Sequence, residues 1–104
     1  MRTGKAGRLY LAVGQEMRRL REDLKLTQDE LASRVQLSRA SIANAEQGRQ
    51  ALPIHHLVDL AEALETSAAE ILRVAENKLS SLPTEVPDDL PQAVVSFLTR
   101  NLRG

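Results

Sequence analysis

The sequence contains no cysteine and very few aromatic residues, and each absence limits what the chain can be. Without cysteine, a disulfide framework and a thiolate metal site are excluded. Aromatic residues make up 2% of the chain and hydrophobic residues 42%, so the core must consist of Leu, Ile, Val and Ala, which suits packed helices better than a sheet. No hydrophobic run is long enough to span a bilayer and no signal peptide is present, so we expect a cytoplasmic protein.

The formal net charge is zero, but the charges are segregated along the chain. Residues 1–49 carry ten Lys and Arg against six Asp and Glu, a net of +4, whereas residues 50–104 carry four against eight, a net of −4. A basic half beside an acidic half is typical of a protein with one surface facing DNA and another facing solvent or a partner. The alternative is chance segregation in a short chain.

The stretch Thr27–Arg49 predicts two short helices joined by a tight turn. Thr27 and Glu30 form the T-x-x-E pattern of a capping box, in which each side chain accepts a hydrogen bond from a backbone N–H of the other residue. Ser38 is a suitable N-cap for the second helix. The outward side of that helix carries small and polar residues: Arg39, Ala40, Ala43 and Asn44. A short helix that presents an arginine and an asparagine has the shape and chemistry to enter a DNA major groove.

With these motifs in this order, the chain resembles the Cro/repressor-type helix-turn-helix family, also called the xenobiotic-response-element-like family. The resemblance covers roughly Val13–Leu72. It rests on four segments: Leu24–Ala32, Ser38–Ile42, Glu46–Arg49 and Leu57–Leu64. It implies an all-α fold, a five-helix phage-repressor-like DNA-binding domain, to which this sequence adds a C-terminal amphipathic helix.

The resemblance implies that the exposed side of the second helix reads bases in double-stranded DNA. Arg39 would donate two hydrogen bonds to O6 and N7 of guanine, Asn44 would pair with N6 and N7 of adenine, and Ala40 would touch a thymine methyl group. Gln28 would hold a phosphate through its side chain and backbone N–H. Three further residues are expected to contact the DNA backbone: Ser38, Gln47 and Arg49.

Two structural expectations also follow from the resemblance. An arginine at position 21 pairs in the family with the glutamate of an E-x-G motif, so Arg21 and Glu46 are expected to form a structural ion pair. The chain departs from the family at three positions where glycine is common, Lys25, Gln36 and Glu65. If the backbone keeps a positive φ there, each non-glycine residue costs about 1 kcal/mol.

Composition divides the 104 residues into one domain with appendages. Residues 1–8, with two glycines and three basic residues, predict a flexible basic arm, or one that follows the DNA backbone. The helix-turn-helix domain is expected over residues 9–79. Residues 80–89 contain two serines, two prolines and acidic residues and predict a linker. Residues 90–104 predict the additional helix.

Hydrophobic spacing gives the remaining helices of the domain. The first is expected to begin near residue 9 or 11 and to end at Leu24. Pro53 suits the start of a later helix, and Ser67 and Glu70 form a second capping-box pattern ahead of the next one. The helix that begins at Pro53 is expected to direct four hydrophobic residues towards the core: Ile54, Leu57, Ala61 and Leu64.

The C-terminal helix carries a hydrophobic stripe that must be covered, because an isolated helix of this length is marginal in water. The stripe consists of Leu90, Val94, Phe97, Leu98 and Leu102. We favour its burial in a homodimer. The alternatives are packing against the fifth helix of the same chain and binding of a different protein, as in antitoxins that engage a toxin through an appended segment.

An enzyme is not expected, because the sequence has no phosphate-binding loop, no carboxylate pair in a pocket-like setting and no Ser/His/Asp constellation. His55 and His56 are adjacent, whereas two metal ligands on one helix need a spacing of three or four residues, so neither a metal nor a cofactor is expected. The sequence therefore predicts a sequence-specific DNA-binding transcriptional regulator, a repressor that binds a pseudo-palindromic operator as a homodimer. The alternative is an antitoxin or regulatory protein whose C-terminal segment binds a partner protein.

Overall fold

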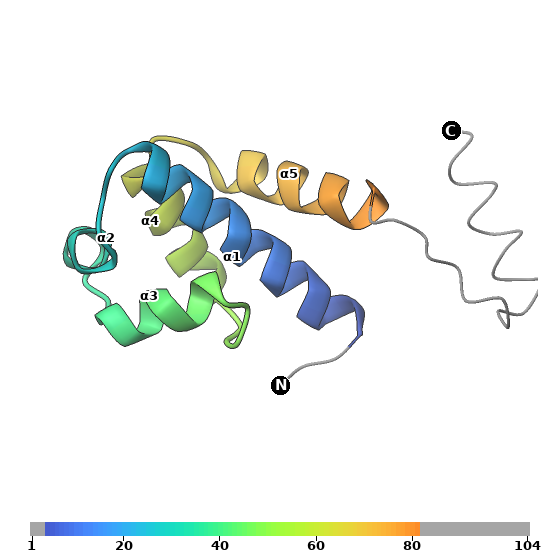
Figure 1. The fold of residues 1–104 in the computed structure, drawn as a ribbon, viewed down its shortest axis with the longest axis horizontal. Helices are drawn as coiled ribbons and strands as arrows, with labels where there is room; N and C mark the ends of the chain where they lie inside the picture. Colours follow the sequence, from blue (N-terminus) through green and yellow to red (C-terminus); the bar gives the residue numbers. More distant parts are fainter. Residues whose placement is uncertain (1–3, 82–104) are drawn as a thin grey trace, which may run out of the picture.

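The computed structural model describes residues 4–81, which form five helices and no strand (Figure 1). They are α1 (Lys5–Asp23), α2 (Gln28–Val35), α3 (Arg39–Glu46), α4 (Ile54–Ala63) and α5 (Ala68–Ser81). The predicted all-α, five-helix fold is confirmed. The predicted C-terminal helix, with Leu90, Val94, Phe97, Leu98 and Leu102, and most of the predicted linker lie outside the described residues.

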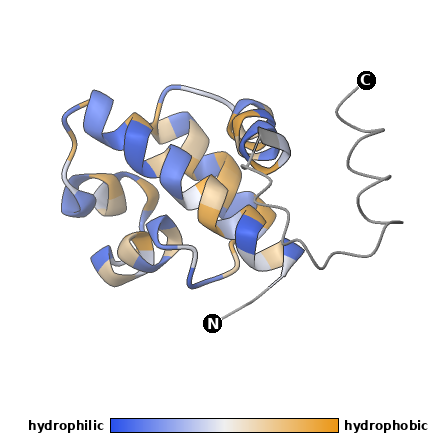
Figure 2. Cartoon of the chain, turned by 45° about the vertical axis from the view of Figure 1, so that its right-hand side comes forward, coloured by the Kyte–Doolittle hydropathy of each residue, from blue (hydrophilic) through white to orange (hydrophobic). Residues whose placement is uncertain are grey.

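The longest helix, α1, runs through the middle of the domain and packs against α5 on one side and α3 on the other, while α2 packs against both α3 and α4 (Figure 1). Each helix carries hydrophobic and hydrophilic residues on different sides (Figure 2). The core is aliphatic, as the composition predicts. Its largest fully buried hydrophobic side chains come from α1 to α5 and the turn after α4: Met17, Leu31, Ile42, Leu60, Leu64 and Ile71.

Two expectations about helix ends are wrong. Residues 5–8, assigned to a flexible arm, belong to α1, whose first turns are held to the domain by the buried Gly7 and by Leu9, which packs against the core. Ile54 does not face inward but is 81% exposed. Since helical side chains tilt towards the N-terminus, the side chain of the first residue of α4 points past the end of the core rather than onto it. The other predicted inward residues of this helix, Leu57, Ala61 and Leu64, are buried.

The three positions at which the family commonly has glycine keep the left-handed backbone. The φ angles of Lys25, Gln36 and Glu65 are 58°, 57° and 60°. At each of them the next N–H bonds back into the helix that has just ended, for example from Leu37 to the carbonyl of Ala32 at 3.0 Å. This hydrogen bond satisfies one of the carbonyl groups that a helix end leaves without a partner.

The end of α3 uses the same conformation but requires a glycine. Gly48 has a φ of 68°, and a Cβ atom placed on it would lie 2.6 Å from the Cα of Leu11. Close approach to α1, rather than φ alone, therefore explains why glycine stands at this one of the four helix ends.

No helix within residues 4–81 has both the length and the hydrophobicity required to cross a membrane.

Candidate nucleic-acid interface

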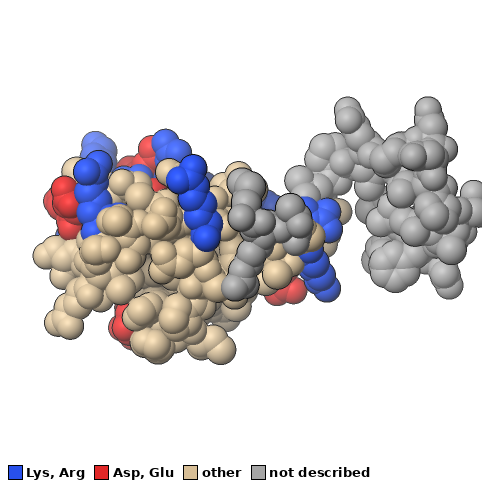
Figure 3. Space-filling model, turned by 90° about the horizontal axis from the view of Figure 1, so that it is seen from below, with Lys and Arg blue, Asp and Glu red and all other residues tan. Residues whose placement is uncertain are grey.

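The helix α3 is amphipathic, with a buried inner side and an open outer side. Ile42, Ala45 and Glu46 are buried against the neighbouring helices. Arg39 and Ala40 are exposed, and Asn44 is half-buried. Seen from below the view of Figure 1, the visible surface of the described residues is mostly uncharged, and Lys and Arg side chains lie along its upper edge and at its right-hand end (Figure 3). The helix thus leaves the three predicted base-reading residues on a side that the described part of the chain does not bury.

The first turn of α3 is held by Ser38. Its Oγ accepts a hydrogen bond from the backbone N–H of Ser41 at 3.0 Å, and its hydroxyl lies 2.9 Å from Ser41 Oγ. This is the predicted N-cap, and it fixes the direction in which Arg39 and Ala40 leave the helix. Ser38 is exposed, so a DNA phosphate can also reach it.

The helix α2, which supports α3, begins with the predicted capping box. Thr27 Oγ1 accepts from the N–H of Glu30 at 3.0 Å, and the Glu30 carboxylate accepts from the N–H of Thr27 at 3.0 Å. The hydrogen bond from Thr27 lowers the pKa of Glu30, so the carboxylate is ionised at neutral pH. The second capping-box pattern forms only on one side, because Ser67 accepts from the N–H of Glu70 while the Glu70 carboxylate accepts from Arg73.

A buried ion pair ties the start and the end of the helix-turn-helix unit to α1. Arg21 donates from Nε and Nη2 to the two carboxylate oxygens of Glu46, at 2.6 and 3.1 Å. The side chains of Arg21 and Glu46 are only 11% and 2% exposed. Arg21 also donates to the carbonyl of Leu26 at 2.7 Å. The hydrogen bond to Glu46 raises the pKa of Arg21, and the expected structural pair is confirmed in its geometry.

The side chain of Gln28 joins this pair, which the sequence analysis did not foresee. Its Nε2 donates to Glu46 Oε1 at 3.1 Å. Gln28 is half-buried at the first position of α2, so its backbone N–H remains at the helix N-terminus, where an anion is favoured. Phosphate binding by Gln28 would therefore use the backbone N–H and the second N–H of Nε2, which does not bond to Glu46.

The close approach of α1 and α3 depends on Gly14, a residue the sequence analysis missed. A Cβ atom at this position would lie 2.2 Å from the carbonyl oxygen of Ala45 and 2.7 Å from that of Glu46. No backbone can come so close to a side chain, so α3 can lie against α1 only because residue 14 has none. Glycine in the middle of a helix costs about 1 kcal/mol relative to alanine. A glycine inside the predicted first helix was therefore the signal in the sequence that pointed to this position.

The residues after α3 complete the predicted interface. Gln47 caps the C-terminal end of α3 and is exposed, and Arg49 is exposed with its N–H bonded to the carbonyl of Asn44 at 3.0 Å. None of the ion pairs of residues 4–81 involves Arg39 or Arg49. Both guanidinium groups are therefore available for an anionic partner.

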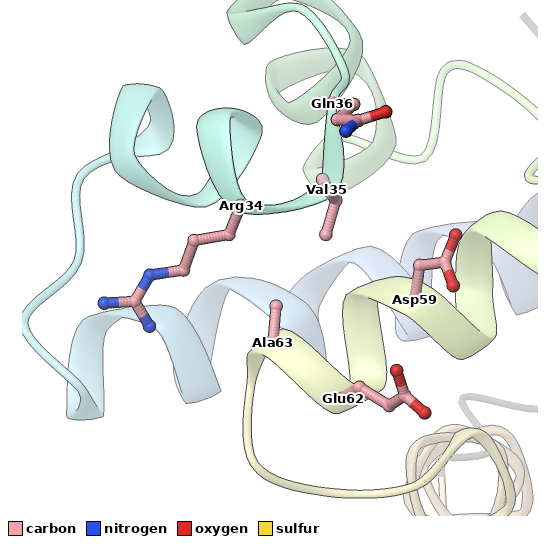
Figure 4. Close-up of a pocket in the computed structure, with 6 residues that line it drawn as sticks. All are labelled: Arg34, Val35, Gln36, Asp59, Glu62 and Ala63. Atoms are coloured by element: carbon pink, nitrogen blue, oxygen red, sulfur yellow. The ribbon is translucent and has the colours of Figure 1, made fainter.

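A hollow of about 400 Å³ lies between the end of α2 and α4, and none of the residues that line it belongs to α3. The two carboxylates of α4, Asp59 and Glu62, line it, but the guanidinium group of Arg34 points away from them (Figure 4). Ligand sites usually have polar groups that converge on one place, and these do not. Within residues 4–81, no three His, Cys, Asp or Glu side chains lie together as metal ligands would.

A family model described as a helix-turn-helix domain matches residues 12–74. A crystal structure of the clp gene regulator ClgR from Corynebacterium glutamicum is 30% identical over 66% of this chain and 88% of its own, with a TM-score of 0.64; a second structure of that regulator is 27% identical over 91% and 90%, with a TM-score of 0.68. The restriction-modification controller protein C.AhdI from Aeromonas hydrophila is 29% identical over 60% of this chain and 94% of its own, with a TM-score of 0.58. No curated protein sequence matches the chain.

Proposed function

The chain belongs to the helix-turn-helix family of DNA-binding transcriptional regulators, and from this premise we propose that it is a cytoplasmic repressor that binds a pseudo-palindromic operator as a homodimer. The observation that carries the proposal is the open outer side of α3, whose N-cap and buried ion pair hold it in one orientation. ClgR is a gene regulator and C.AhdI a controller protein, which agrees with this role. Repression needs only occupancy of the operator, so the protein acts as a binding protein and not as an enzyme.

Each residue of the predicted interface has a role in this proposal. Arg39 donates to O6 and N7 of a guanine, Asn44 pairs with an adenine, and Ala40 contacts a thymine methyl group. The phosphate contacts come from residues at both ends of the helix-turn-helix unit, and they set register without reading sequence. They are made by Gln28, Ser38, Gln47 and Arg49.

Selection of bound sites from random DNA tests the proposal. The expected result is an enriched pseudo-palindrome whose half-sites are about 10 base pairs apart, or a multiple of that spacing, because each α3 of a dimer must face the major groove on one side of the duplex. Sedimentation of the selected complex should give two chains per site. No enriched sequence, or a strictly monomeric complex, contradicts the proposal.

Replacing Arg39 with alanine separates base reading from phosphate binding. We expect the free energy of binding to the selected operator to weaken by about 1–3 kcal/mol, and the sequence preference at one base pair to relax. The matched control is Arg49→Ala, another exposed arginine of the same interface. It should weaken all sequences similarly and reduce the slope of log affinity against log salt by about one. Fluorescence anisotropy on the operator and on its single-base variants measures both. An Arg39→Ala protein that binds the operator as tightly as the parent contradicts the assignment.

The competing function is that of an antitoxin or regulatory protein that binds a different protein through Leu90–Leu102. Deletion of residues 83–104 distinguishes the two functions, since that sequence carries the hydrophobic stripe. Loss of self-association with no other change supports the homodimer. Retained dimers together with loss of a copurifying protein support the partner-binding function.

A further inference from the structure

A hydrophobic groove lies between the beginning of α1 and the end of α5. Its volume is about 320 Å³, and three leucines and three polar residues line it: Leu9, Leu72, Leu79, Lys5, Glu76 and Ser80. Leu9 and Leu72 reach the edge of the core, while Leu79 is half-buried near the end of α5. Within the described residues, this end of the molecule lies away from α3 (Figure 1). An occupant of the groove would therefore leave the candidate DNA-binding surface free.

The chain itself supplies a matching occupant. The helix α5 ends at Ser81, directly after the groove residues Leu79 and Ser80, so residues 82–104 continue from the groove. Within them, Leu90–Leu102 carries five hydrophobic residues at helical spacing. Asp88 and Asp89 precede this stripe, and Arg100 and Arg103 lie near its end. The segment therefore has carboxylates that can pair with Lys5 of the groove and guanidinium groups that can pair with Glu76.

We propose that the groove of each chain binds the segment Leu90–Leu102 of a second copy, so that the two copies exchange their C-terminal segments. This proposal rests on the homodimer of the proposed function, and it identifies the groove as the surface through which the two chains associate. The eight residues 82–89 span up to about 27 Å when extended, which is enough to reach a neighbouring chain.

The lengths of the groove and of the segment favour the exchange. The α5 side of the groove runs from Leu72 to Ser80, a helical distance of about 12 Å, whereas Leu90–Leu102 would be about 18 Å long as a helix. A segment that folded onto its own groove would leave part of its stripe in water. Two exchanged segments can cover each other's remaining hydrophobic residues, which a single chain cannot do.

A charge placed in the groove tests the proposal. Leu79→Lys in the full chain should raise the dimer dissociation constant at least about tenfold, since it removes one buried leucine contact and buries a charge. The matched control is Val58→Lys, which changes a hydrophobic residue that is 42% exposed on α4 and should alter the constant less than about twofold. Analytical ultracentrifugation measures both constants, and circular dichroism checks that each variant is folded. An unchanged dimer in Leu79→Lys overturns the proposal.

Because the chain has no cysteine, disulfide cross-linking can identify the occupant without background. One full-length variant carries Ser80→Cys, and a second carries Ala93→Cys or Asn101→Cys, which lie near the two ends of the stripe. Mixing and oxidising the two single variants should give a disulfide-linked pair of chains that reducing agent separates. A chain with both substitutions that forms the bond only within a monomer, or no cross-link from either end, overturns the exchange. Neither readout involves DNA, so failure here leaves the operator selection unaffected, and failure of that selection leaves the cross-link unaffected.

Discussion

Replacing Glu46 with alanine is expected to lower the free energy of unfolding by about 3–5 kcal/mol, because it leaves the guanidinium group of Arg21 buried without its counter-ion. Arg21 is 11% exposed and would keep only the carbonyl of Leu26 as a partner. For a domain of this size the loss corresponds to a fall in the melting temperature of at least about 12 °C. Urea and thermal unfolding followed by circular dichroism give both values.

The control for this prediction is a salt bridge of the same geometry at the surface. Arg73 donates from two nitrogens to Glu70, at 3.0 and 2.6 Å, but the two side chains are 59% and 49% exposed. Because water solvates either group when its partner is removed, Arg73→Ala should lower the free energy of unfolding far less than Glu46→Ala does. Equal losses in the two variants would mean that burial does not determine the strength of the Arg21–Glu46 pair.

A double variant shows whether the Arg21–Glu46 pair itself stabilises the fold, or whether each single variant is destabilised only because it leaves one charged group buried without a counter-ion. Arg21→Met combined with Glu46→Leu should be less destabilised than either single change, since it leaves no unpaired charge in the interior. Gln28 loses its acceptor in this variant but is half-buried and can bond to water. A double variant whose loss equals the sum of the two single losses contradicts this reading.

Replacing Gly14 with alanine is expected to destabilise the domain by about 3 kcal/mol, the upper end of the usual cost of overpacking, and to displace α3. The added Cβ would lie 2.2 Å from the carbonyl oxygen of Ala45, and the backbone atoms of Glu46 are nearly as close, so no flexible side chain can make room. Separation of α1 from α3 would also lengthen the Arg21–Glu46 contact. Chemical unfolding measures the stability, and weaker binding to the selected operator would report the displacement of α3.

Helix propensity gives the opposite sign for this substitution, which makes the test informative. In an exposed helix interior, glycine to alanine stabilises by about 1 kcal/mol. Gln15→Ala is the control, since this neighbour is exposed on the same helix and should change the stability by less than about 0.5 kcal/mol. A Gly14→Ala protein as stable as the parent would show that α1 and α3 can move apart at no cost.

Much of the fold and of the candidate site was predictable because its determinants are local. Capping residues act within a turn of the helix they begin, so Thr27, Glu30 and Ser38 located α2 and α3 correctly. The spacing of hydrophobic residues gave most of the core. The resemblance to a known family added what local patterns do not contain, namely the pairing of Arg21 with Glu46 and the positive φ angles at three helix ends.

Other features were decided only by the way in which the helices cross. Nothing near Gly14 in the sequence indicates that the last turn of α3 lies against it, because the two segments are brought together by packing. The same holds for the hydrogen bond from Gln28 to Glu46 and for the groove between α1 and α5. Ile54 shows the limit of periodicity, since a residue at the correct spacing is exposed when the helix begins beyond the core. Local patterns in the sequence thus predict most of the helical residues and the sides that they bury, with residues 5–8 and Ile54 as the exceptions. The tertiary structure decided how closely the helices approach, because that distance depends on side chains that are far apart in the chain and meet only when all five helices are packed.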